Sequence, residues 1–230
     1  MATLQSIDKL VQEMEAGLHK PGRWLPDHPV IGKLQRGELT RRQIAGMMGQ
    51  IYVQTTEVVR WLGALYARCP IKEVRREIFN NLLEEELGHF SGTDAHFYLA
   101  RRVGEAAGAT RGEMESVKRL PATERIIKLG EHMFFEQEDW VAAFGTAFGF
   151  EYQSPLAFGA IAEALKKSYG MSDPDVEFFS VHVTADEDHT GAIVKVIEKY
   201  ASAPDTHAKV KEAAWKYGDH YDMMSTYESF

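Results

Sequence analysis

The sequence predicts an all-α protein that forms one domain of about seven or eight helices. Apolar residues recur at helical spacing along almost all of the 230 residues, and no segment alternates convincingly as a half-buried strand would. No linker, internal repeat or low-complexity stretch divides the chain. We therefore expect residues 1–230 to form a single helical domain.

The order of the helices follows from their start and stop signals. A first helix is expected at about 3–18, followed by a loop rich in proline and glycine. The stretch "TRRQ" at 40–43 is typical of a capping box that opens a long helix, and a further helix runs from about residue 72 into "NNLLEEELGH". The stretch "TRGE" at 110–113 repeats the capping signature. Later helices are expected at 122–147, 150–168, 174–201 and 205–226.

Composition and charge exclude several classes of function. Hydrophobic residues make up 44% of the chain and charged residues 26%, as in a globular protein with a sizeable core. The net charge of −8 and the lack of a basic block argue against nucleic acid or an anionic membrane as partner. Cys69 is the single cysteine, which excludes an intrachain disulfide and a thiolate metal cluster. The amphipathic start and the absence of a long apolar run lead us to expect a cytoplasmic protein.

The stretch "HVTADEDH" places three candidate metal ligands on one helix. His182, Asp186 and His189 stand at positions i, i+4 and i+7, which share one narrow face of a helix. That face lies on or beside the apolar stripe that should be buried. Because burying two imidazoles and a carboxylate is expensive unless something binds them, a metal ion is the natural candidate.

A second group of candidates lies in "NNLLEEELGHFSGTDAH". Glu85 and His89 can share a metal on an unbroken helix, as can Glu86 and His89. Glu85 and His96 are separated by eleven residues, or roughly 16 Å of straight helix. They can meet one ion only if the helix breaks, which Gly88, Ser91 and Gly92 allow, so the residues alone favour His89 over His96. Glu84 is interpreted as part of a solvated face.

Glu151 completes the set of candidates from the residues alone. It is the only charged residue between Trp140 and Glu163, and a lone acid in such an apolar setting must be paired or coordinated. Nitrogen and oxygen ligands without thiolate suit iron or manganese, and also zinc. Several acids and histidines on facing helices favour a dinuclear redox site. Glu57 could add a carboxylate, but a position on the helix surface is the simpler interpretation.

The blocks "NNLLEEELGHFSGTDAH", "FGFEY" and "HVTADEDH" together resemble the haem-oxygenase-like di-iron oxidases and oxygenases. The same superfamily holds thiaminase-II-like proteins and the pyrroloquinoline-quinone synthase. The resemblance covers most of the chain and implies a haem-oxygenase-like bundle of about seven helices. It also implies two irons per protomer, a reduced pair that reacts with O2, and a mobile third core helix that becomes ordered when metal binds.

The resemblance also implies which residues hold the metal. Glu85 and His182 would hold one iron, with His96 or His89 as the third ligand, of which we favour His96. The second iron would be held by the remaining acids and histidine, namely Glu151, Asp186 and His189. The residues that would act in catalysis are Glu85, Glu151 and His182.

These expectations lead to a function and to two rivals. We expect an O2-dependent oxidase or oxygenase that acts on a small metabolite (an amino acid, amine or fatty acid) in a biosynthetic pathway, as a homodimer. Some members of the family convert their own tyrosine into p-aminobenzoate, and the residues for that reaction do not map convincingly onto this chain. One rival is a metal-free, quinone-synthase-like oxidase with the same bundle. The other is a protein-interaction module related to bacterial proteins that associate with death domains.

Overall fold

The computed structural model describes the backbone of residues 6–225, and the side chains of the same residues except 184–189. Within this part of the chain all regular structure is helical and no strand occurs, which confirms the all-α class. The helices α1 to α11 are Ile7–Leu18, Pro29–Gln35, Arg41–Arg68, Lys72–Leu87, His96–Ala106, Arg111–Glu115, Pro121–Glu131, Ala142–Glu151, Ser154–Tyr169, Glu177–Tyr200 and Pro204–Gly218.

Side-chain caps fix two of the helix starts that the sequence predicts. The Thr40 hydroxyl accepts a hydrogen bond from the Gln43 backbone, and the Gln43 side chain accepts one from the Thr40 backbone, so the capping box of α3 is confirmed. Thr110 and Glu113 form the same reciprocal pair at the start of α6. Both boxes satisfy backbone N–H groups that the first turn of a helix leaves without partners.

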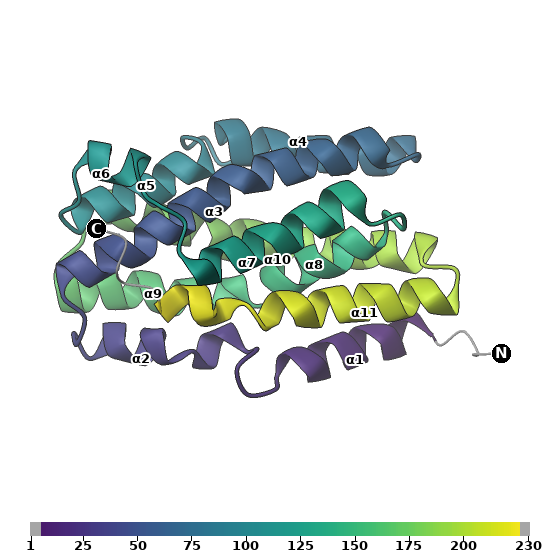
Figure 1. Cartoon of the computed structure of the whole chain (residues 1–230), viewed down its shortest axis with the longest axis horizontal. Helices are drawn as coiled ribbons and strands as arrows, with labels where there is room; N and C mark the ends of the chain where they lie inside the picture. The colour runs from purple at the N-terminus through teal and green to yellow at the C-terminus, as the bar shows by residue number, and fades with distance from the viewer. Residues whose placement is uncertain (1–5, 226–230) are drawn as a thin grey trace.

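The long helices run side by side along the longest axis of the molecule (Figure 1). In this view α3 and α4 lie along the upper side, α1 and α2 lie along the lower side, and α7, α8 and α10 pass between them. α3 packs against both α4 and α5, and α10 packs against α8 and α9. The interior between α4, α5, α8 and α10 is where the candidate ligands meet.

Two glycines allow α8 to lie unusually close to α11. A Cβ atom on Gly145 would overlap the carbonyl oxygen of Val210, and one on Gly149 would overlap that of Ala214. The backbones of the two helices therefore touch, and this pair makes the most extensive contact between any two elements of the described chain. The contact fixes the position of Glu151, the last residue of α8.

The helix that carries the three consecutive glutamates ends at Leu87, as the sequence predicts. Gly88 adopts the left-handed conformation with φ 59°, which glycine tolerates and which commonly ends a helix. Residues 88–95 then fold back, with Gly92 also left-handed at φ 70°, and α5 begins at His96. This break brings His96 back toward Glu85.

The prediction of one continuous helix at 122–147 is wrong, because the helix is interrupted within this range. α7 ends at Glu131, a single π turn follows at His132–Glu136, and α8 begins only at Ala142. The Arg68 guanidinium, from the end of α3, donates hydrogen bonds to the carbonyls of Phe134 and Gln137. These carbonyls are thus satisfied by a distant side chain, so no further helical turn is needed there.

None of the helices in the described part of the chain is both long enough and apolar enough to span a bilayer.

Candidate metal centre

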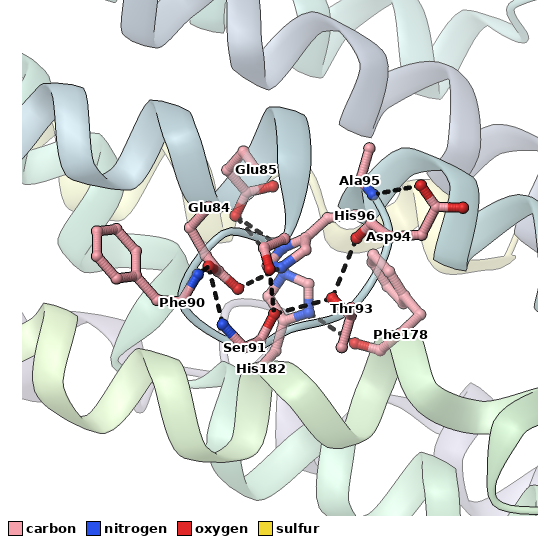
Figure 2. Close-up of polar contacts among 11 residues, drawn as sticks. Glu84, Glu85, Phe90, Ser91, Thr93, Asp94, Ala95, His96, Phe178 and His182 are labelled. Atoms are coloured by element: carbon pink, nitrogen blue, oxygen red, sulfur yellow. Dashed lines mark hydrogen bonds and ion pairs between the residues drawn. The ribbon is translucent and has the colours of Figure 1, made fainter.

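Three predicted ligands meet in the interior between α4, α5 and α10 (Figure 2). The Nδ1 atom of His96 lies 3.0 Å from Oε1 of Glu85, and Nε2 of His182 lies 3.9 Å from the same oxygen. One donor atom from each of the three residues lies within 4.8 Å of the other two, and all three residues are buried. The structure thus places His96, at the start of α5, in this cluster.

The ring nitrogen of each histidine that points away from Glu85 has its own partner. Nδ1 of His182 lies 2.6 Å from the carbonyl oxygen of Phe178, one helical turn earlier, so this nitrogen carries the proton. Nε2 of His96 lies 3.2 Å from Oε1 of Glu84. Such outer partners fix the orientation of metal-ligating histidines and leave the inner nitrogen free to bind.

The charges of the neighbouring acids control the protonation of His96. Burial alone lowers the pKa of His96, but the charge and hydrogen bond of Glu85, together with those of Glu84, outweigh burial and raise this pKa to about 9. For Glu84, burial raises the pKa, but hydrogen bonds from Ser91, Phe90 and His96 outweigh it and hold the pKa below its ordinary value. A proton on His96 therefore occupies the place that a cation would take.

Aromatic rings shield the cluster from water. The His182 ring lies 4.7 Å from the ring of Phe178, 5.5 Å from that of Phe158 and 6.4 Å from that of Phe150, between ring centroids. A cavity lies beside the cluster, and Glu85 and His182 form part of its wall. Apart from these two residues, its described polar lining consists of Gln54, Thr55, Asn81, Thr146, Glu151, Tyr217 and Tyr221.

Glu151 lies on the wall of this same cavity, but it is not part of the compact group of three. It is buried, as its apolar sequence context predicts. Asp186 and His189 follow His182 on α10 by four and seven residues, and their side chains lie outside the described residues. That Glu151, Asp186 and His189 bind a second metal stays a prediction.

Two predicted positions do not reach the cluster. His89 is exposed, and its ring packs edge-on against Phe90 with 4.8 Å between centroids. Glu86 is exposed as well. The unbroken-helix arrangement, in which His89 would share a metal with Glu85 or Glu86, is therefore absent from the described structure.

The interpretation of Glu84 as part of a solvated face is wrong, since its relative exposure is only 3%. A helix turns by about 100° per residue, so a neighbour of the inward-facing Glu85 is expected to point elsewhere. Glu84 is nevertheless buried because residues 88–95 fold back over the end of α4 and donate to its carboxylate. A glutamate followed by a glycine-rich loop was the one signal of this role in the sequence.

Glu57 is also misplaced by sequence reasoning, because it is buried rather than on the helix surface. Its carboxylate forms ion pairs with Arg60 and with Arg119. The two arginines therefore compensate the charge of the buried Glu57 carboxylate. Tyr217 and Tyr221, which sequence reasoning did not single out, line the cavity.

A second hollow adjoins the cavity and leads along α4, α8 and α10. The two share five lining residues, among them Glu151, Asn81 and Ala147. Phe90, from the loop after α4, lines the second hollow and is 62% exposed. The candidate centre can thus be approached along two apolar surfaces that meet at Glu151.

The donor set fits a hard or borderline transition metal. Buried imidazole nitrogen and carboxylate oxygen donors suit iron or manganese, and the described residues near the cluster include no thiolate. The inner nitrogens face one carboxylate oxygen and the outer nitrogens are satisfied, which is the arrangement expected of ligands held ready for an ion.

Comparison with known proteins agrees with this chemistry. A model of the family described as "iron-containing redox enzyme", of haem-oxygenase type, matches residues 46–222, which include every candidate ligand. The chain belongs to this family. The family resemblance inferred from the three sequence blocks is thereby confirmed.

Relatives in this iron-containing redox enzyme family are biosynthetic enzymes. A 4-aminobenzoate synthase from Nitrosomonas europaea is 29% identical over 94% of this chain and 89% of its own length. A pyrroloquinoline-quinone synthase from Cronobacter sakazakii is 30% identical, but over only 47% of this chain and 43% of its own. The similarity to the 4-aminobenzoate synthase thus extends over nearly the whole chain, including the segments that carry the candidate ligands.

Solved structures show that the bundle has the haem-oxygenase-like fold. A domain with this fold from Shewanella denitrificans superposes with a TM-score of 0.74 at 16% identity, covering 95% of this chain and 88% of that one. A TenA homologue from Pseudomonas syringae gives a TM-score of 0.77 at 10% identity, covering 96% and 90%. The predicted fold class is confirmed, although the structure divides some of the expected helices.

Proposed function

We propose that this chain is an O2-dependent, non-haem di-iron oxidase or oxygenase that acts on a small metabolite in a biosynthetic pathway. The observation that carries the proposal is the buried group of Glu85, His96 and His182, of which Glu85 and His182 line a largely apolar cavity. Membership of an iron-containing redox family supports iron as the metal. The coverage of the 4-aminobenzoate synthase relative supports a biosynthetic role.

The proposal assigns six ligands to two irons. Glu85, His96 and His182 would hold the first iron, and Glu151, Asp186 and His189 would hold the second. A reduced pair of irons supplies the electrons that activate O2. We propose two metals rather than one because six ligands are more than a single ion with open coordination positions requires.

The protein's own residues have three tasks in this scheme. Glu85 accepts a hydrogen bond from His96, at the start of α5, and faces His182 on α10, so it holds both imidazoles around one point. The carbonyl of Phe178 keeps the proton of His182 on the nitrogen that faces away from this point. The phenylalanines around His182 give the centre an apolar surrounding on that side.

The lining of the cavity supports a substrate with a largely apolar body. Among the described residues that line it there is no lysine or arginine, so that wall offers a substrate carboxylate no cationic partner. Gln54, Thr55, Asn81 and Thr146 supply neutral hydrogen-bonding groups instead. A small apolar molecule or an amine fits this wall better than a free amino acid does.

A more specific candidate function is formation of 4-aminobenzoate. It is favoured by the coverage of the 4-aminobenzoate synthase relative, whereas the quinone synthase matches less than half of this chain. Tyr217 and Tyr221 place two phenol rings in the cavity wall. Growth of a 4-aminobenzoate auxotroph that expresses this chain tests the candidate, and failure to grow while the purified protein consumes O2 would exclude it.

Anaerobic titration with Fe(II) tests the main proposal. We expect saturation near two equivalents per chain and an optical change on exposure to O2. His96→Ala and His182→Ala should each lower the iron content and abolish O2 consumption, while His89→Ala should retain both. Saturation at one equivalent would contradict the dinuclear site, and O2-dependent turnover without metal would favour the quinone-synthase-like rival.

We also propose that the chain acts as a homodimer on a freely diffusing substrate, without nucleic acid or membrane. Light scattering after size-exclusion chromatography distinguishes a dimer from a monomer. Iron binding without any oxidase activity would instead favour the rival protein-interaction role.

A further inference from the structure

Glu84 stands at the junction between the candidate centre and the loop that follows α4. One of its carboxylate oxygens, Oε1, lies 3.2 Å from Nε2 of His96. The other, Oε2, accepts hydrogen bonds from the backbone N–H groups of Phe90 at 2.6 Å and Ser91 at 3.2 Å (Figure 2). We propose that Glu84 is a positioning residue, which orients His96 for metal binding and locks the loop 88–95 to the centre.

The cost of burying this acid indicates that it has such a role. Glu84 is almost completely buried, and an ionised carboxylate in the interior is stable only when its oxygens accept several hydrogen bonds. The two backbone donors and the imidazole supply these bonds, one of them to a residue of the candidate metal set. Glu86, two residues on, is exposed.

The effect on His96 follows from the tautomers of imidazole. A neutral imidazole carries one proton, and the nitrogen that binds a metal must be the one without it. An acceptor at Nε2 keeps the proton there and leaves Nδ1, which faces Glu85, free to bind. The carboxylate of Glu84 does for His96 what the Phe178 carbonyl does for His182.

This inference rests on the proposed metal centre, and the substitution Glu84→Gln tests it within the full chain. The glutamine oxygen can still accept from the backbone of Phe90 and Ser91, so its amide NH2 then points toward His96. The glutamine NH2 and the Nε2–H of His96 would then face each other as two donors. His96 would therefore carry its proton on Nδ1, the nitrogen that is proposed to bind the metal. We expect the affinity for Co(II), as a probe for Fe(II), to fall about 10- to 100-fold.

The matched control is Glu86→Gln, which removes the same charge from an exposed position two residues further along the same helix and should keep the affinity of the wild type. A role in folding alone is separated by proton NMR of the Co(II)-loaded protein, in which the N–H protons of bound imidazoles are strongly shifted. The signal that disappears in His96→Ala should shift or exchange faster with water in Glu84→Gln. The signal of His182, whose proton goes to Phe178, should stay in place.

Each outcome decides between the two levels of the proposal. A wild-type chain that binds no Co(II) or Fe(II) overturns the metal centre, and the role of Glu84 with it. Normal metal binding by the wild type, with equal affinities and an unchanged His96 signal in Glu84→Gln, overturns the role of Glu84 alone. If Glu84→Gln does not fold, Glu84→Ala, which also removes the acceptor at Nε2 of His96, provides the comparison, and an unchanged His96 signal there would again contradict the role.

Discussion

His96 is the residue at which charge, burial and metal binding meet. It lies between the carboxylates of Glu84 and Glu85, with a hydrogen bond to each. A protonated imidazole there neutralises part of the negative charge of a buried site, and a metal ion would replace that proton. Protons and metal ions therefore compete for the same position.

The first prediction concerns the stability of the metal-free protein as a function of pH. The pKa of His96 is raised from 6.5 to about 9 in the folded chain, so its charged form stabilises the fold. This contribution is fully present below pH 6.5 and is lost as the pH rises toward 9. Because each pKa unit corresponds to about 1.4 kcal/mol, the loss is roughly 3 kcal/mol. Urea unfolding of the EDTA-treated protein at both pH values measures it.

Two variants serve as references for this measurement. His89→Ala should lose stability over the same pH range as the wild type, because His89 is exposed and outside the cluster. His96→Ala should lose far less, since the group that titrates is gone. An equal loss in His96→Ala and wild type would show that another group is responsible.

Residue patterns in the sequence singled out Glu85 and His182, whereas His96 was favoured over His89 only by the family resemblance. The buried positions of Glu85, His182 and Glu151 follow from a polar residue on an apolar face, a pattern that is visible in the sequence. Glu84 and Glu57 could not be placed in this way, because their burial depends on partners from segments that are far away or folded back. Such partners have no fixed spacing in the sequence.

At the scale of elements, the loop 88–95 determines whether α5 delivers His96 to the centre. Gly88 and Gly92 both have positive φ, but their surroundings differ. A Cβ atom on Gly88 would overlap the carbonyl oxygens of Thr93 and Asp94, whereas one on Gly92 would have no neighbour within 4 Å. Alanine substitutions at the two glycines therefore separate the energetic cost of a left-handed backbone from the cost of a steric clash.

The second prediction uses this difference. Gly92→Ala should lower the free energy of unfolding by about 1–2 kcal/mol, the cost of a left-handed alanine. Gly88→Ala should cost about 1–3 kcal/mol more, since the loop must move away from the new methyl group. Gly88→Ala should also lower the iron content, because the loop that moves carries the backbone N–H groups that donate to the Glu84 carboxylate. Urea unfolding and iron analysis measure the two effects, and equal iron content in both variants would contradict the link.

The elements that the sequence predicted well carry local signals. The capping boxes at Thr40 and Thr110 and the glycine break after Leu87 are each written into a few adjacent residues. The break between α7 and α8 carries no such signal, because neither glycine nor proline occurs at 131–141. It depends on Arg68, which reaches across from α3, so only the tertiary structure shows it.

At the scale of the whole molecule, the contact between α8 and α11 holds the wall that bears Glu151. Gly145 and Gly149 are spaced four apart and face α11, which makes this contact a backbone-to-backbone one. Side chains of any size would separate the helices. The close approach of α8 and α11 therefore depends on two positions without a side chain.

The third prediction tests this dependence. Gly145→Ala should lower the free energy of unfolding by about 1–3 kcal/mol, because its methyl group meets the backbone of Val210. Gly63→Ala, in the interior of α3 with open space around the new atom, should instead raise it by about 0.5–1 kcal/mol. Thermal and urea unfolding of both variants provide the comparison. A stable Gly145→Ala variant would mean that α11 can shift without cost.

The helix break after Leu87 also affects the order in which parts of the candidate centre form during protein synthesis. Glu85 and His96 are only eleven residues apart, and Glu84 reaches Phe90 across six, so this part needs the closure of a short loop, which takes about 10–100 ns. His182 lies much further along the chain, and at about 5–20 residues per second several seconds of synthesis separate it from His96. On the ribosome, Glu85 and His96 can meet before His182 has been synthesised. The order of translation thus makes α10 the element that completes the centre.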